Sequence, residues 1–359
     1  MRIKSTAEWG RGQISLASVT AACLLAAVFS GCSWQKTPSS EKHHVTTQQM
    51  LQQLEKMLPA GKTTPKKVTS KEDPTLLATG LIFSTQGKSA SVSVAIRNSK
   101  HVGNGRECPD SAYYPHDNCS KKRLPDGEML TTIQGPQDQG EPSGLQFSTI
   151  SIEYGSGEVV LVSQVGKKAE KNDSAQDESL PVSQNQLSSV ATSSAWKTMA
   201  STLKTSAPAN REESSFPTAK EITKTLTSLV PGKVDISDPG GSEGFGHVVI
   251  DDGLGPCLIA VNVQRWGPGK SAVRDLFKGS QKIHGTQVKS TKTRPIGNGA
   301  NAFQWTYDTL RSDGLRVVIA EVNSRAYYLG ADRVNPILDY GQLKKIALAE
   351  AWVSVGTGG

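Results

Sequence analysis

The stretches TQQMLQQLEKMLP (residues 47–59) and AKEITKTLTSLVP (residues 219–231) are two copies of one pattern. Apolar residues recur at i, i+4, i+7 and i+8, as Met50, Leu54, Met57 and Leu58 in the first copy and Ile222, Leu226, Leu229 and Val230 in the second. This spacing places them on one face of an amphipathic helix, and the final proline ends each helix. An internal repeat of this kind predicts a duplicated domain.

Short strand patterns follow each helix at matching places. Alternating apolar residues, such as Val92, Val94 and Ile96, are typical of a half-buried antiparallel strand. A further strand is expected after Asp126-Gly127 in the first copy and after His284-Gly285 in the second. The remaining predicted strands are 81–84, 92–96, 147–154 and 159–162 in the first copy, and 248–253, 258–263, 303–307 and 317–320 in the second.

A second helix closes each copy, with Ser183 and Asp339 as the expected N-caps. Trp196 and Trp352 lie at matching ends of these helices, and we expect both to pack against the sheet rather than to hold a ligand. The fold class predicted is α+β. Each of two homologous repeats should be an antiparallel sheet of about five strands, flanked by an N-terminal and a C-terminal helix that cover one face.

The N-terminus carries the signals of export. Arg2, Lys4 and Arg11 precede an uncharged run from Ile14 to Phe29, as in a secretory signal peptide. The run is too short and too rich in Ser, Thr and Ala for a spanning helix, which needs about 20 strongly apolar residues. The expected organisation is a lipoprotein signal peptide (1–31), a flexible tether (32–45), α+β repeat 1 (46–204), a linker (205–217) and α+β repeat 2 (218–355).

Ser30-Gly31-Cys32 resembles a bacterial lipobox, with Phe29 where that motif usually has Leu. The resemblance implies cleavage before Cys32, attachment of diacylglycerol to its sulfur, and a palmitate-type acyl anchor. A signal anchor, or an ordinary signal with an incidental cysteine, is the alternative. Each reading places the body on the extracytoplasmic face of the cell membrane or beyond it.

Composition and charge narrow the class of partner. Apolar residues make up 36% of the chain and charged residues 20%, as in a folded, soluble body. The segment before Cys32 contributes +2 of the net charge of +7, so the mature chain carries +5. A solvated basic face accounts for this excess, with attraction to an anionic envelope surface as the alternative, and the predicted location argues against nucleic acid as a partner.

The remaining cysteines have different expected roles. Cys108 and Cys119 flank a loop rich in turn residues, and in an oxidising compartment a disulfide is the default. A metal site formed by these cysteines with His116 and Asp117 is the alternative, although the spacing matches no zinc pattern. Cys257 is left over and is expected to be a buried, inert thiol, with a reactive thiol as the alternative.

A search for catalytic motifs gives little. The chain has no HExxH, GxSxG or phosphate-binding glycine loop. Ser194-Ala195-Trp196-Lys197 fits the S-x-x-K pattern of penicillin-binding enzymes, but the companion S-D-N and K-T-G triplets are missing and the match falls near a predicted helix C-terminus. The sequence therefore predicts a protein that is not an enzyme and needs no cofactor or metal.

The run from Cys119 to Leu124-Pro125-Asp126-Gly127, together with the terminal Ala-Trp helix, is similar to uncharacterised two-repeat envelope lipoproteins of high-GC Gram-positive bacteria. That resemblance implies architecture and location, and no mechanism. The leading hypothesis is a lipid-anchored binding or interaction module for an unknown envelope protein or ligand. Tyr113, Tyr114, Arg265 and Trp266, which lie in the two divergent loops, are the candidate contacts. The alternatives are an envelope sensor or regulator acting on a membrane protein, and a cell-wall hydrolase or transferase.

Overall fold

The computed structural model describes residues 45–66, 76–98, 107–166, 180–204, 216–267, 271–297 and 299–356. The predicted lipidation site, Cys32, lies outside these ranges. The chain divides into two compact units. The first consists of Met1–Arg106, Lys122–Leu130 and Thr149–Pro208, and the second of Glu107–Lys121, Thr131–Ser148 and Ala209–Gly359. The segment Glu107–Lys121, which precedes the second repeat in the sequence by about a hundred residues, thus belongs to the second unit.

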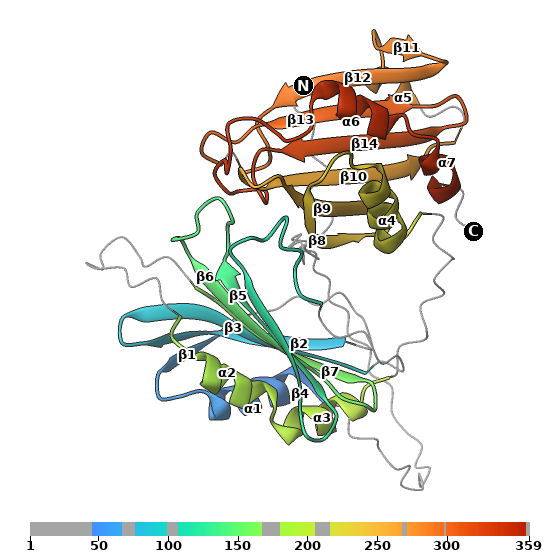
Figure 1. The fold of residues 1–359 in the computed structure, drawn as a ribbon. Helices are drawn as coiled ribbons and strands as arrows, with labels where there is room; N and C mark the ends of the chain where they lie inside the picture. The colour runs from blue at the N-terminus through green and yellow to red at the C-terminus, as the bar shows by residue number, and fades with distance from the viewer. Residues whose placement is uncertain are drawn as a thin grey trace, which may run out of the picture. The chain divides into compact units, whose positions relative to one another are not determined.

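Two seven-stranded antiparallel sheets form the framework (Figure 1). The first has the order β1-β2-β3-β7-β6-β5-β4 and the second β11-β12-β13-β14-β10-β9-β8. The strands of the first are β1 (Lys62–Lys66), β2 (Leu76–Thr85), β3 (Lys88–Asn98), β4 (Asn118–Arg123), β5 (Met129–Pro136), β6 (Gln146–Glu153) and β7 (Glu158–Gly166). The strands of the second are β8 (Asp235–Ser242), β9 (Phe245–Asp251), β10 (Cys257–Arg265), β11 (Gln281–Ile283), β12 (Thr286–Thr293), β13 (Gln304–Leu310) and β14 (Leu315–Val322).

Helices cover one face of each sheet (Figure 1). They are α1 (Thr47–Met57), α2 (Gln184–Ala191) and α3 (Ser194–Ser201) on the first sheet, and α4 (Ala219–Leu229), α6 (Tyr340–Ala347) and α7 (Ala351–Gly356) on the second; the short helix α5 (Ser271–Leu276) precedes β11. Capping boxes begin α1, α2, α4 and α6, with Thr46, Ser183, Thr218 and Asp339 as N-caps. The N-caps predicted at Ser183 and Asp339 are confirmed.

The cores follow the predicted apolar pattern. Met50 and Leu54 of α1 pack with Val92, Val94 and Ile96 of β3, and all five side chains are fully buried. In the second unit Ile222 and Leu226 of α4 pack against β9 and β10 in the same way. The prediction that both helices of a copy lie on one face of its sheet is confirmed by these single, continuous clusters.

Trp196 and Trp352 are the anchors of the closing helices. Their side chains are 0% and 1% exposed, and each indole Nε1–H donates a 2.7 Å hydrogen bond to a backbone oxygen, that of Val190 or of Ile346. The acceptor lies six residues before the tryptophan in both units. The predicted core role of both tryptophans is confirmed, and the hydrogen bond satisfies the one polar group that burial would otherwise leave unpaired.

The predicted number of about five strands per sheet was too small. The strands missed are β1 and β4 in the first sheet and β8 and β11 in the second. β1, β4 and β8 are mostly exposed, so no apolar alternation marks them in the sequence. Pro239 and a register shift between Ser237 and Gly240 interrupt β8, as is common where an edge strand must not recruit another chain.

The closing helices also differ from the prediction, because each is broken into two. In the first unit α2 ends at Ala191, and Ser193 caps a new helix, α3, by accepting a hydrogen bond from the Ala195 N–H. Ser194 therefore stands at the beginning of a helix and not near a helix C-terminus as predicted. In the described part of the chain, no helix has the length and apolar character needed to cross a membrane.

Candidate functional site

The cysteine segment, defined here as Glu107–Lys121, is built into the second unit. Cys108 and Cys119 form the predicted disulfide, which closes a separation of 11 residues. The alternative metal site fails because both thiols are bonded to each other; the nearby Asp117 carboxylate accepts a 2.6 Å hydrogen bond from Gln139 Nε2. No group of three or more metal-binding side chains occurs among the described residues.

Asp110 ties this segment to β9. Its two carboxylate oxygens lie 2.7 and 2.9 Å from Nε2 of His247, whose side chain is 2% exposed. A Cβ at position 240 would collide with the same imidazole nitrogen, so Gly240 makes room for the pair. The other ring nitrogen, Nδ1, is buried and has no hydrogen-bond partner. A histidine that acts as a general base needs its second ring nitrogen within reach of the nucleophile, but Nδ1 of His247 is buried. We therefore assign the Asp110–His247 pair a structural role, in which it fixes the cysteine segment to β9.

Tyr113 is the centre of an aromatic stack on the same segment. Its ring lies 4.9 Å from that of Tyr327 with an angle of 28° between the planes, and 5.5 Å from that of Phe245. The Tyr327 backbone N–H also donates a 2.9 Å hydrogen bond to the Ala112 oxygen. Burial raises the pKa of Tyr113 far above its ordinary value, with contributions from Tyr327 and Asp110. Tyr113 therefore anchors the segment.

The other predicted contacts lie elsewhere on the second unit. Arg265 ends β10, and its guanidinium is 3.6 Å from the Asp313 carboxylate in the turn between β13 and β14. Trp266 donates from its indole to Gln264 Oε1 at 2.9 Å and from its backbone to the Gly314 oxygen. Tyr114 is the exception, because it lies on the cysteine segment itself and donates its backbone N–H to the Asp110 oxygen. Arg265 and Trp266 contact the β13–β14 turn, whereas Tyr113 packs on Tyr327 and Phe245.

A buried carboxylate, Glu321 of β14, is a group that sequence reasoning missed. It is 0% exposed and accepts hydrogen bonds from the backbone N–H groups of Ile337, at 2.7 Å, and Leu338, at 3.2 Å. The Cys257 thiol is hydrogen-bonded to it and Arg333 lies close enough to act on its charge. Burial raises the pKa of Glu321 to about 7, against the opposing effect of these donors. Burial likewise raises the pKa of Cys257, and the predicted burial of that thiol is confirmed.

The lysine of the S-x-x-K match, Lys197, contacts a carboxylate and an aromatic ring. Lys197 Nζ lies 3.7 Å from a Glu128 carboxylate oxygen and 4.7 Å from the centre of the Tyr154 ring. Burial, followed by the nearby carboxylates, raises the pKa of Tyr154 to about 12.

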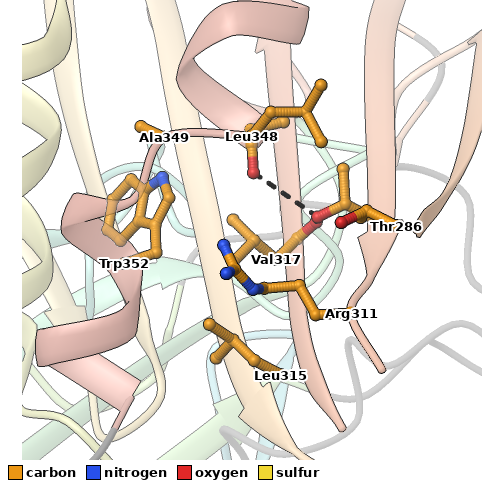
Figure 2. Close-up of a pocket in the computed structure, with 9 residues that line it drawn as sticks. Thr286, Arg311, Leu315, Val317, Leu348, Ala349 and Trp352 are labelled. Atoms are coloured by element: carbon orange, nitrogen blue, oxygen red, sulfur yellow. Dashed lines mark hydrogen bonds between the residues drawn. The ribbon is translucent and has the colours of Figure 1, made fainter. Parts of the chain in front are cut away.

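Figure 2 shows a pocket under the break between α6 and α7. Arg311 and Leu315 line it from the β13–β14 side, and Trp352 lines it from α7. Its interior of about 10 Å³ is about the space that one water molecule needs. Thr309 Oγ1 donates across it to the Ala347 oxygen at 3.4 Å, and Arg311 is paired with the exposed Glu350. The pocket is too small for a substrate or cofactor.

A half-buried aromatic surface lies at the junction of β13 and α6. We define it as Phe303, Trp305, Tyr307 and Tyr340, none of which is fully buried. Tyr340 stacks on Trp305 with 4.4 Å between ring centres and 17° between planes, and it meets the Tyr307 ring edge-on at 5.9 Å. Lys292 Nζ lies 4.1 Å from the centre of the Phe303 ring. Phe303, Trp305 and Tyr307 were predicted as strand residues and Tyr340 as a helix residue, and none of the four was predicted to bind a ligand.

Comparison with known proteins leaves the family open. No protein-family model matches the chain, and no curated protein matches it significantly in sequence. Among solved structures, the complex of Pseudomonas aeruginosa MucA and MucB aligns with 76% of this chain and 87% of that chain, at 11% identity and a TM-score of 0.16. A TM-score this low establishes neither a shared fold nor a shared function.

Proposed function

We propose that this chain is a lipid-anchored, extracytoplasmic, non-catalytic binding module of the cell envelope. The observation that carries the proposal is the aromatic surface of the second unit. Four half-buried aromatic residues lie together on a strand and a helix, where Trp305 and Tyr307 pack partly against the core and the Lys292 ammonium lies over the Phe303 ring. Partly exposed aromatic rings on a rigid scaffold supply contact area at a low entropic cost, and such residues dominate binding surfaces.

The Cys108–Cys119 disulfide supports the extracytoplasmic location. Disulfides persist in oxidising compartments and are rare in the cytoplasm. Here the bridge closes a segment whose other residues, Asp110 and Tyr113, are bound into the second unit. In this proposal, the lipobox-like Phe29-Ser30-Gly31-Cys32 attaches the protein to the outer side of the membrane through a lipid on Cys32.

The polar groups that resemble catalytic machinery support a binding role. Asp110 and His247 satisfy each other, and Lys197 is held by Glu128. Glu321 is fully buried beneath the loop that ends at Leu338. Each group is therefore accounted for by packing or pairing within its own unit.

Anchoring and binding can be tested in one experiment. Mass spectrometry of the chain from membranes should find a diacylated Cys32 at the new N-terminus, and Cys32→Ala should release the protein from the membrane. Unchanged processing and retention of the variant would refute the anchor. The released Cys32→Ala protein should still sediment with delipidated envelope material, and Tyr340→Gln should abolish that sedimentation. Equal sedimentation with and without Tyr340→Gln would refute binding through the aromatic surface.

A further inference from the structure

The ligand of the aromatic surface can be argued from its chemistry, and the argument rests on the proposed binding function. Trp305 and Tyr307 alternate along β13, with Phe303 one residue before the strand, so their side chains lie on the same face of the sheet. Tyr340, the first residue of α6, completes the surface by stacking on Trp305. The result is a group of ring faces held by a strand and a helix together.

The fold does not require these aromatic residues. The turns that end β6 and β13 have the same hydrogen bonds, from the Tyr154 N–H to the Glu158 oxygen and from the Arg311 N–H to the Leu315 oxygen. Counting back from these turns, Ser148 and Ile150 of the first sheet correspond to Trp305 and Tyr307, and from the matching N-caps Gln184 corresponds to Tyr340. The corresponding strand and helix of the first sheet, β6 and α2, therefore pack together without an aromatic stack.

The surface also holds a polar group that is not satisfied. The Trp305 indole Nε1 is buried and has no hydrogen-bond partner in the described structure. A buried N–H without an acceptor is costly and calls for an explanation, because native proteins leave few of them. Protein atoms cover this nitrogen, so a ligand on the ring faces does not reach it.

Basic residues border the rings. Residues 279–299 contain Lys282, Lys289, Lys292 and Arg294 and no acidic residue. Lys292 is opposite Trp305 in the β12–β13 register, and Arg294 is the first residue after β12. Both are exposed, and within the described residues neither lies within 4.0 Å of a carboxylate. Lys282 is opposite Gln287 and therefore points to the other face.

We propose that the aromatic surface binds an acidic sugar unit of an envelope glycan. The polarised C–H face of a pyranose ring packs on the negative face of the Trp305–Tyr340 stack. Lys292 and Arg294 bind the carboxylate or phosphate of the sugar. An acidic peptide matches the two cations but offers no flat C–H face, and a neutral sugar leaves both cations unpaired.

The proposal is tested by calorimetric titration of the full chain, purified in detergent, with oligogalacturonate as the acidic probe. Neutral N-acetylglucosamine oligomers and poly-glutamate are the comparison probes. Oligogalacturonate should bind at least about tenfold more tightly than either, since charge-assisted hydrogen bonds and ring stacking act together only there. Absence of oligogalacturonate binding, or equal binding of poly-glutamate, overturns the proposal.

Matched variants separate the surface from general charge attraction. Lys292→Glu should weaken binding by about tenfold or more, whereas Lys282→Glu changes the net charge equally on the opposite face and should change it by less than about twofold. Tyr340→Gln introduces the residue that the first unit has at this place and should weaken binding as much as Lys292→Glu. Equal effects of Lys292→Glu and Lys282→Glu overturn the assignment. If envelope sedimentation depends on Tyr340 while oligogalacturonate does not bind, the glycan inference fails and the proposed function stands.

Discussion

Glu321→Gln provides a sharp test of the energetics of the second unit. The Glu321 side chain is fully buried on the helix-facing side of β14, where it accepts from the backbone N–H groups of Ile337 and Leu338. These bonds hold the end of the loop that leads into α6. Burial raises the pKa of the carboxyl group from 4.5 to about 7, with Cys257 and Arg333 as the nearest titratable groups.

The direction of the pH effect follows from this shift. In the unfolded chain the carboxyl group loses its proton near pH 4.5, whereas in the folded chain it keeps the proton up to about pH 7. Between these values the folded state binds more protons, so stability is highest below pH 4.5 and falls as the pH rises through 7. One pKa unit corresponds to about 1.4 kcal/mol, so the loss amounts to about 3 kcal/mol.

Glu321→Gln keeps an oxygen acceptor for both N–H groups and removes the titration. Urea unfolding of the second unit at pH 4.5 and at pH 8 should show that the wild-type chain loses about 3 kcal/mol more than the variant. All other groups titrate in both proteins and cancel in this difference. Glu350→Gln, an exposed glutamate paired with Arg311, serves as the control and should change stability by less than about 1 kcal/mol. Parallel pH curves for wild type and Glu321→Gln would refute the reasoning.

Three further changes test what stabilises the second unit. Trp352→Ala should destabilise the second unit by about 3–5 kcal/mol in urea unfolding, because the indole is buried and hydrogen-bonded; a loss below about 1 kcal/mol contradicts its role as an anchor. Asp110→Ala leaves His247 buried without a partner and should cost about 1–3 kcal/mol, most of which Asp110→Asn should restore. Replacing Cys108 and Cys119 by serine should cost about 3 kcal/mol through loop closure, and reduction of the wild-type chain should reproduce this loss.

The sequence was informative wherever an element buries one apolar face. Met50 and Leu54 of α1, and Val92 and Val94 of β3, appear in the core as their spacing predicts. The edge strands β1 and β8 could not be predicted in this way. Their side chains face solvent on both sides, and their pairing depends on backbone groups that every residue carries.

The site residues were harder to predict because their partners are distant in the sequence. Tyr113 was predicted as a binding contact because it is a loop aromatic, and its ring packs against Tyr327, more than 200 residues away. Asp110 and His247 are separated by 137 residues, and neither carries a local motif. Glu321 is in phase with Val317 and Ile319 along β14, so the alternation places it on the core face, where a charged residue is not expected. The backbone N–H groups of Ile337 and Leu338, which are distant in the sequence, supply the hydrogen bonds that accompany its burial.

The two units show which features the fold requires and which it does not. The strand order is the same in both sheets when the second is read from its other edge, as β8-β9-β10-β14-β13-β12-β11. In both units the buried tryptophan donates a 2.7 Å hydrogen bond to the backbone oxygen six residues earlier. A duplication predicts this agreement. We therefore attribute the shared strand order and the shared tryptophan hydrogen bonds to the stability of the fold. The docked cysteine segment and the aromatic surface occur in the second unit, whereas Ser148, Ile150 and Gln184 occupy the aromatic positions in the first sheet and its closing helix. Because a sheet of this order forms without the stack, the aromatic surface is better explained by binding than by folding.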